Sequence, residues 1–401
     1  MHTMKKFLAL LMISSILMPG MTGCLPGDAT LTITSEDEEL AGTAVTAGDP
    51  DSYYYKLFVL NEGQMGTNGA SLDFLRFTDG TYVNSSFFKM NKSKKLGDVG
   101  NDIKLRGNLA WITLNNSGLV EVINALNEVE YATFDIPSPR NISFTSRYAF
   151  VTSWAGASSN PFVDNPGCVY RIDLNSGAVG QHPIEVGWQP EGIAGDSNGF
   201  VWVANSGGIH GMANGEYDTR LMVINGDSGN IEHTISVAPN LKDVFYDPVN
   251  HLVWVTSYGN YFSIPSGVYP VSATQYQPIA RSNALQAVRF TCASCPGDGF
   301  LYVIGTEDEW NWYGDKEYTL YKISARGEVT ATPFSGSLAE RVTNPYGIAV
   351  NPVNGDLYIT DAGDYVNPGK LYCFDKNLTL NWMATTGVCP GHLALYAIEW
   401  N

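Results

Sequence analysis

The stretch Pro345-Tyr-Gly-Ile-Ala-Val-Asn-Pro-Val-Asn-Gly-Asp-Leu-Tyr-Ile-Thr-Asp361 contains the pattern that decides the fold. Two apolar segments, residues 345–350 and 357–361, are separated by a short run rich in Asn, Pro and Gly. Short segments rich in β-branched and aromatic residues predict strands, and turn-forming residues between them predict a tight reversal. The stretch therefore indicates two neighbouring antiparallel strands.

The second of these segments recurs seven times along the chain. Its copies lie at 57–60, 110–113, 149–152, 201–204, 253–256, 301–304 and 357–360. A further apolar segment follows each copy, at 72–75, 119–122, 169–172, 221–224, 268–271, 320–323 and 371–374. After most of these comes a tight turn and another alternating strand. Four strands in each repeat of about 50 residues, seven times over, predict an all-β, seven-bladed β-propeller that spans residues 51–401.

The two ends of the predicted ring complement each other. The first repeat begins directly at its second strand, in Tyr53-Tyr-Tyr-Lys-Leu57, whereas Gly391-His-Leu-Ala-Leu-Tyr-Ala-Ile398 is a spare strand after the seventh repeat. We therefore expect the C-terminal strand to complete the N-terminal blade. Such closure leaves no open sheet edge for pairing with other chains.

The charge of the chain excludes one class of partner. Its 401 residues include 23 Lys and Arg against 40 Asp and Glu, a formal net charge of −17. Binding of nucleic acid needs clustered cations that displace counterions from phosphates. We therefore expect no nucleic-acid partner.

The N-terminus has the features of an export signal. Lys5 and Lys6 precede an apolar run of twelve residues, which is too short to span a bilayer, and Met21-Thr-Gly-Cys24 is similar to a bacterial lipobox. These features predict a lipoprotein signal peptide over residues 1–23 and lipidation of Cys24, with several acyl chains giving a stable anchor. An ordinary secretory signal is the alternative. Residues 24–50, with the acidic run Ser35-Glu-Asp-Glu-Glu39, are predicted to form an acylated, flexible, acidic tether.

Export would place the remaining cysteines in a non-reducing compartment. Cys292 and Cys295 lie in one turn, where they can form a local disulfide or remain free thiols. Cys373 and Cys389 could bridge neighbouring strands, whereas Cys168 has no evident partner. No second CxxC or HxxxH accompanies Cys292 and Cys295, so a zinc site is not indicated.

Aromatic residues collect in the loops that should surround the mouth of the central channel. Loops after the second strands are long, and loops on the opposite face are short, which favours ligand binding at the mouth. The candidate ligand-binding residues in these loops are Trp154, Trp188, His210, Tyr258, Tyr261, Phe262, Trp310, Trp312 and Tyr313. By contrast, Trp111, Trp202 and Trp254 lie within alternating strands, where packing between blades is the expected role.

The predicted starts of the innermost strands place polar side chains in a ring around the channel. They align as 101–102, 140–141, 191–192, 242–243, 286–287, 346–347 and 391–392. Candidate ligand-binding residues in this ring are Arg140, Glu191, Lys242, Tyr346 and His392. The alternative is that the charged members only pair with each other and with water.

The motifs around 351–361 and 246–256 resemble the broad YncE-like and NHL-like propeller superfamily, over roughly residues 51–401. Together with the lipobox and the short tether, they resemble surface-layer-type propeller lipoproteins of Gram-negative gut bacteria. That resemblance implies an outer-membrane lipoprotein facing the cell surface, which captures vitamin B12 (cobalamin) and related corrinoids. It also implies delivery of the ligand to a TonB-dependent transporter.

Three functional classes are open at this point. Non-enzymatic capture of a large, flat, mostly neutral ligand suits an aromatic-rimmed concavity with scattered amides, and corrinoids fit that description. In such a complex His210 or His392 could ligate cobalt. A docking platform for glycan or protein would use the same exposed aromatic residues. A metal-dependent propeller lactonase or lyase would need a metal held by carboxylates and amides, or a His/Glu acid–base pair. Asp102, Glu191, Asp243 and Asn141 are candidate calcium ligands, but Arg140 and Lys242 in the same ring argue against a dication. We therefore expect no catalytic residue, no metal and no cofactor other than the bound ligand.

Overall fold

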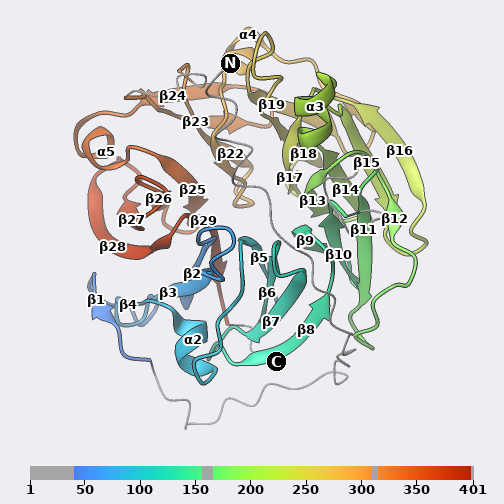
Figure 1. Cartoon of the computed structure of the whole chain (residues 1–401). Coiled ribbons are helices and arrows are strands. Elements are labelled where there is room, and N and C mark those ends of the chain that lie inside the picture. The colour runs from blue at the N-terminus through green and yellow to red at the C-terminus, as the bar shows by residue number, and fades with distance from the viewer. Residues whose placement is uncertain (1–39, 156–165, 309–314, 399–401) are drawn as a thin grey trace.

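The computed structural model describes residues 40–155, 166–308 and 315–398, which form seven antiparallel sheets arranged in a ring (Figure 1). The first sheet has five strands and each of the others has four. All seven pairs of segments found in the sequence are adjacent second and third strands of one sheet. The prediction of an all-β, seven-bladed propeller is confirmed.

The first three blades contain the strands up to Glu185, together with one strand from the C-terminal end of the chain. From outer edge to channel, the first blade has β1 (Thr43–Ala44), β4 (Thr81–Val83), β3 (Ser71–Arg76), β2 (Lys56–Asn61) and β29 (Pro390–Tyr396). The second has β8 (Glu130–Asp135), β7 (Leu119–Asn124), β6 (Leu109–Leu114) and β5 (Gly100–Arg106). The third has β12 (Ile184–Glu185), β11 (Cys168–Asp173), β10 (Tyr148–Ser153) and β9 (Pro139–Phe144).

The other four blades follow in the same order. The fourth has β16 (Ile231–Ser236), β15 (Arg220–Asn225), β14 (Phe200–Asn205) and β13 (Pro190–Gly195). The fifth has β20 (Gln277–Pro278), β19 (Gly267–Ser272), β18 (Leu252–Ser257) and β17 (Leu241–Asp247). The sixth has β24 (Val329–Pro333), β23 (Thr319–Ser324), β22 (Phe300–Gly305) and β21 (Cys292–Ser294), and the seventh β28 (Leu380–Val388), β27 (Pro368–Phe374), β26 (Leu357–Asp361) and β25 (Pro345–Val350).

In the described residues, four short helices lie in connections between strands: α2 (Ser86–Met90), α3 (Gly208–Asn214), α4 (Asn283–Gln286) and α5 (Gly336–Arg341). None of the helices in the described parts of the chain is long and apolar enough to cross a bilayer.

The ring is closed by pairing between the two ends of the described chain. β29 runs antiparallel to β2, with Lys56 opposite Tyr396 and Val59 opposite Leu393. Tyr396 is almost fully buried, and its hydroxyl donates to Asn108 Oδ1 of the second blade at 2.7 Å. The predicted closure of the N-terminal blade by the C-terminal strand is therefore confirmed.

The first blade also carries a strand that the sequence analysis places in the tether. In β1, Thr43 pairs with Tyr82 and Ala44 with Thr81 of β4. Gly42 lies so close to β4 that a Cβ atom there would be 2.3 Å from the carbonyl oxygen of Tyr82. Residues 40–50 of the predicted tether therefore lie against the first blade.

The blades are joined by one aromatic residue at the same position of every second strand: Phe58, Trp111, Phe150, Trp202, Trp254, Tyr302 and Tyr358. All seven are buried. Trp111 stacks on Phe134 at a centroid distance of 5.5 Å and packs against the strands of the third blade. Trp202 and Trp254 likewise pack against the following blade. The expectation that these tryptophans fill the space between blades is confirmed.

Candidate functional site

The innermost strands start at the mouth face with an irregularity that turns side chains toward the channel. The pairing register shifts between Pro190 and Ile193 of β13, and between Leu241 and Val244 of β17. Equivalent shifts occur in β5, β9 and β25, and β29 has one at the same level. A β-bulge adds a residue and re-aims the side chains beside it. The bulges therefore produce the ring of polar residues that the sequence indicates.

The structure corrects one member of that ring. The sequence analysis aligns 286–287 with the start of the sixth inner strand, but Gln286 is the last residue of α4. Ala293 is opposite Val303 and Cys292 opposite Ile304, so Thr291 and Cys292 occupy the ring positions of this blade. The inserted helix α4, whose Leu285 is buried, supplied an apolar pattern that imitates a strand.

Three charged residues from consecutive blades form one ion-pair network at the mouth. Both oxygens of Glu191 accept from Arg140, with Nη2 to Oε2 at 3.0 Å and Nη2 to Oε1 at 3.3 Å. Lys242 Nζ donates to the same Oε2 at 3.1 Å. The side chain of Glu191 is 6% exposed, that of Arg140 14% and that of Lys242 22%. Burial opposes ionisation of Glu191, but the two cations outweigh it and lower its pKa.

A tryptophan completes this side of the mouth. The guanidinium carbon of Arg140 lies 4.4 Å from the ring centroid of Trp154, a cation–π contact. The predicted residues Arg140, Trp154, Glu191 and Lys242 therefore form one connected group, which we call the charged half of the mouth.

Threonines that the sequence analysis did not select hold the backbone of this ring. Thr113 Oγ1 donates to the carbonyl of Arg140 at 2.6 Å, and Thr152 Oγ1 donates to the carbonyl of Glu191 at 2.7 Å. Thr360 does the same for Pro390 at 2.6 Å. In each case a second strand fixes the start of the next blade's inner strand. The sequence does contain a signal for these residues, because a threonine recurs near the end of several second strands.

Below the network, a second layer of side chains faces the channel. Asp102 Oδ1 accepts from Lys104 Nζ at 3.0 Å, and Asp102 Oδ2 accepts from the backbone of Ile142 at 3.1 Å. Although burial opposes it, the positive charges of Lys104 and His392 lower the pKa of Asp102. The pKa of Asp243 is raised, chiefly by burial. The negative charge of Glu191 adds to this rise, and the nearby cations offset it only in part.

Tyrosines from the fourth, fifth and seventh blades also line the mouth. Tyr258 stacks on Tyr261 at 6.4 Å between centroids, and Tyr217 meets Tyr261 edge to face at 5.9 Å. In the seventh blade Tyr346 meets Tyr365 edge to face at 5.6 Å. We call these five residues the tyrosine half of the mouth. The sequence analysis found Tyr258, Tyr261 and Tyr346, but not Tyr217 and Tyr365, which lie within long loops and carry no repeat signal.

The tyrosine hydroxyls are hydrogen-bond donors at neutral pH. Burial and the nearby carboxylate of Asp243 raise the pKa of Tyr258 well above its ordinary value. Burial and Glu62 do the same for Tyr346, whose hydroxyl donates to Glu62 Oε2 at 2.8 Å. Glu62 Oε1 also lies 3.5 Å from Nε2 of His392. The carboxylate of Glu62 therefore contacts two predicted residues, Tyr346 and His392, although Glu62 itself was not predicted from the sequence.

The remaining candidates lie further out on the mouth face. Trp188 and His210 stack at a centroid distance of 4.5 Å with an interplanar angle of 9°, and both are half-buried. Phe262 is 80% exposed at the tip of a turn in which Asn260 Oδ1 accepts from three successive backbone N–H groups. Trp310, Trp312 and Tyr313 lie outside the described residues, as does Cys24.

The arrangement gives no grouped set of metal ligands. Within 40–155, 166–308 and 315–398, no three His, Cys, Asp or Glu side chains come together as a group that could hold a metal ion. Glu191, the carboxylate best placed for a cation, is shared by Arg140 and Lys242. His210 Nδ1 lies 3.2 Å from the side-chain nitrogen of Asn214, so this imidazole already has a polar neighbour.

The five described cysteines are free thiols, and four of them are buried. The disulfide considered for Cys292 and Cys295 is therefore not formed. Cys292 is held in β21 opposite Ile304, whereas Cys295 lies just beyond the strand. Burial raises the pKa of Cys292, and it raises the pKa of Cys295 to about 12. Neither sulfur is a ready thiolate nucleophile at neutral pH.

The thiols give a direct test. In the chain with Cys24→Ser, we expect all five cysteines to react with Ellman's reagent after denaturation without reductant, and to react far more slowly in the native protein, because the buried thiols are neutral and shielded. A count of three in denaturant would show that one disulfide forms and would contradict the structure.

The fold places the chain among the seven-bladed propeller proteins. It is similar to a hypothetical selenium-binding protein from Sulfolobus tokodaii, with TM-score 0.62, 9% identity, and 87% of this chain and 96% of that one covered. It is also similar to a quinonprotein alcohol dehydrogenase-like protein from Bacteroides thetaiotaomicron, with TM-score 0.59, 11% identity, and 86% and 78% covered.

A third similar structure is a putative 6-phosphogluconolactonase from Bacteroides uniformis, with TM-score 0.57, 10% identity, and coverage of 86% of this chain and 99% of that one. No protein-family model and no curated protein matches the sequence. Identities of this size show the common fold, and the varied functions of these proteins show that the ring alone does not determine the activity.

Proposed function

We propose that this protein captures a large, mostly uncharged ligand with extended flat faces at the mouth of the propeller, and that the ligand is a corrinoid such as cobalamin. The proposed setting is a lipoprotein anchored through Cys24 in the outer membrane, which passes the ligand to a TonB-dependent transporter. The setting and the transporter are supported by the lipobox and by the resemblance described above.

One observation carries the proposal: the mouth combines a charged half, whose three ionised side chains pair with each other, with a tyrosine half. Because Glu191 pairs with both Arg140 and Lys242, these three side chains have a net charge of only +1, and the charged half offers N–H donors with a modest net attraction for an anion. The tyrosine half offers aromatic faces and hydroxyl donors. Apolar contact area with a few placed polar groups is the usual composition of a site for a large organic ligand.

The lactonase alternative has less support from the same contacts. A propeller hydrolase of that kind would need carboxylates free to hold a metal ion. Here Glu191 is committed to two cations, and Asp102 to Lys104 and a backbone N–H. A glycan-binding platform would use the same aromatic residues, so a binding experiment is needed to distinguish it from a corrinoid-capturing protein.

The test is calorimetric titration of the mature-length chain carrying Cys24→Ser with cyanocobalamin. We expect one-to-one binding that is unchanged by a chelator. Tyr261→Ala should weaken binding at least tenfold, because it removes the ring that joins Tyr258 and Tyr217; each ten-fold change is about 1.4 kcal/mol. The matched control is Tyr53→Ala, a 67% exposed tyrosine next to the outer start of β2 and away from the mouth.

Absence of heat at micromolar protein would overturn the corrinoid assignment. Binding of soluble oligosaccharides that depends on Tyr261 would then support the platform function. Metal-dependent hydrolysis of a lactone would support the enzymatic one.

A further inference from the structure

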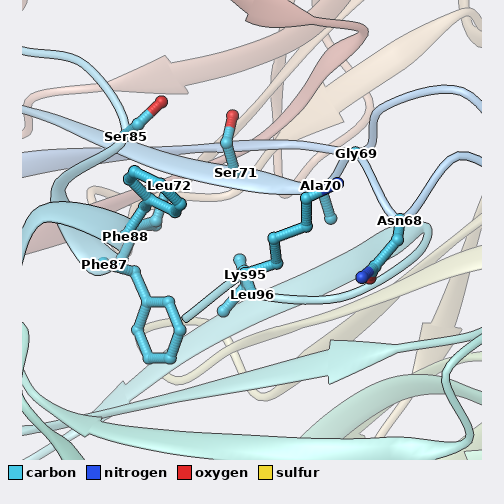
Figure 2. A pocket seen from close by; sticks show the side chains of 10 residues that line it. All are labelled: Asn68, Gly69, Ala70, Ser71, Leu72, Ser85, Phe87, Phe88, Lys95 and Leu96. Carbon is cyan, nitrogen blue, oxygen red and sulfur yellow. The ribbon is translucent and has the colours of Figure 1, made fainter. Parts of the chain in front are cut away.

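A cavity of about 300 Å³ lies on the mouth face of the first blade (Figure 2). Its walls come from the start of β3, from α2 and from the segment that leads into β5. Figure 2 shows the rings of Phe87 and Phe88 at one end and Asn68 at the other. Leu72 and Leu96 add apolar wall, so the cavity suits apolar side chains.

A basic patch borders this cavity. Lys89, Lys92, Lys94 and Lys95 all fall within seven residues and are exposed, in a chain whose net charge is −17. Lys94 pairs with Glu121 at 3.2 Å and also with Glu130. The other three lysines form no ion pair with any described residue. We call these four lysines the lysine patch.

The described chain begins beside this cavity. Thr43 lies opposite Tyr82 in an antiparallel register, which directs the chain before Thr43 toward Ser85 at the cavity wall. Leu40, the first described residue, packs against the apolar cluster that contains Phe87 and Leu96. Leu40 therefore lies beside the segment that carries the lysine patch.

Those residues match the patch and the cavity in chemistry. Glu36-Asp-Glu-Glu39 immediately precedes Leu40, and Leu31-Thr-Ile-Thr34, a few residues earlier, alternates apolar residues with threonine. Ile33 is seven residues from Leu40, a reach of up to about 25 Å in an extended chain. A segment linked this closely is present at an effective concentration in the millimolar range.

We propose that residues 31–39 dock on this surface, with the acidic run against the lysine patch and with Leu31 and Ile33 in the cavity. Opposite charges across the contact fix its register, and burial of the two apolar side chains stabilises the docked segment. The docked segment covers the otherwise unpartnered lysines.

Docking has a consequence for the proposed function. With the anchor at Cys24, a chain fastened at residue 31 leaves seven residues to the membrane, or about 25 Å, whereas a chain fastened at residue 40 leaves sixteen, or about 55 Å. The cavity is on the mouth face, so docking holds the mouth toward the bilayer that would contain the transporter. This consequence rests on the proposed function, whereas the docking does not.

The experiment is cysteine trapping in the full mature chain with Cys24→Ser. Ile33→Cys combined with Phe88→Cys should form a disulfide under mild oxidation at least ten times faster than Ile33→Cys combined with Val353→Cys. Both partner residues are exposed, but Val353 lies in the turn between β25 and β26 on the opposite face. The reaction should slow at high salt, because salt screens the lysine patch.

A charge-swap cycle then tests the register. Glu36→Lys with Glu38→Lys should slow trapping, Lys89→Glu with Lys95→Glu should slow it similarly, and the two sets combined should restore it. Equal trapping rates at Phe88 and Val353 would overturn the proposal. Protection of residues 85–96 from hydrogen exchange by added octanoate, without trapping, would also overturn it and assign the cavity to a free acidic amphiphile. Calorimetry with cyanocobalamin is independent of these outcomes, so failure of either proposal is distinguishable.

Discussion

Replacement of Trp254 by alanine is expected to lower the free energy of unfolding by about 3–5 kcal/mol. Trp254 is fully buried and packs between the fifth and sixth blades, against Leu301 and Val303 of β22 and Leu285 of α4. Truncation would remove the contacts that join two blades and leave a cavity that rigid strands cannot collapse to fill. Urea denaturation followed by circular dichroism measures the change.

The matched control for this change is Trp254→Phe. The indole N–H of Trp254 has no hydrogen-bond partner among the described residues, so phenylalanine keeps most of the packing and removes a buried unsatisfied donor. We expect a loss of less than about half that of the alanine variant. Equal losses for the two variants would show that packing at this position does not decide stability.

Replacement of Glu191 by glutamine is expected to destabilise the protein by roughly 2–4 kcal/mol at pH 7. The change keeps the shape of the side chain but leaves Arg140 and Lys242 facing each other without a counter-charge. Because all three side chains are largely shielded from water, solvent screens this repulsion only in part. Urea denaturation again measures the effect, and Glu185→Gln, the same change at an exposed site of β12, should alter stability by no more than about 0.5 kcal/mol.

The pH dependence of this difference has a definite sign. The pKa of Glu191 is lowered in the folded state, so its ion pairs contribute their full stability above the ordinary pKa of a glutamate, about 4.5. That contribution is lost as the pH falls through the lower folded-state value. The gap between wild type and Glu191→Gln should therefore stay constant from pH 7 to pH 5 and narrow only below about pH 4.5. A gap that narrows already between pH 7 and pH 6 would contradict the ion-pair network.

The sequence predicted the blades because the repeat is local. Each pair of second and third strands is joined by one loop and carries its own apolar alternation, so it could be recognised without knowledge of the rest of the ring. The start of β21 could not be placed in this way. Helix α4 brings Leu285 and Val288 into the same core as a strand would, and apolar spacing over so short a segment does not distinguish the two.

Among the site residues, Arg140, Glu191 and Lys242 were found because they occupy equivalent positions in successive repeats. Glu62, Tyr217 and Tyr365 were not, because each lies in a loop of its own length and meets its partner only after the ring has formed. The state of Cys292 and Cys295, disulfide or free thiols, also could not be decided from the sequence. They are three residues apart in the chain, yet both are free thiols, with Cys292 held in β21 by its pairing with β22 and Cys295 just beyond that strand.

The sequence by itself determined the number of blades, the closure of the ring and the polar positions at the mouth in six of the seven blades. Each follows from residue spacing within a repeat, since alternation and turn residues act over short distances along the chain. The tertiary structure alone decided which charges pair with each other, which tyrosines contact one another, and where Leu40 lies relative to the lysine patch. Those relations join residues tens to hundreds of positions apart, and they exist only because the bulged inner strands and the packed blades bring them within a few ångströms.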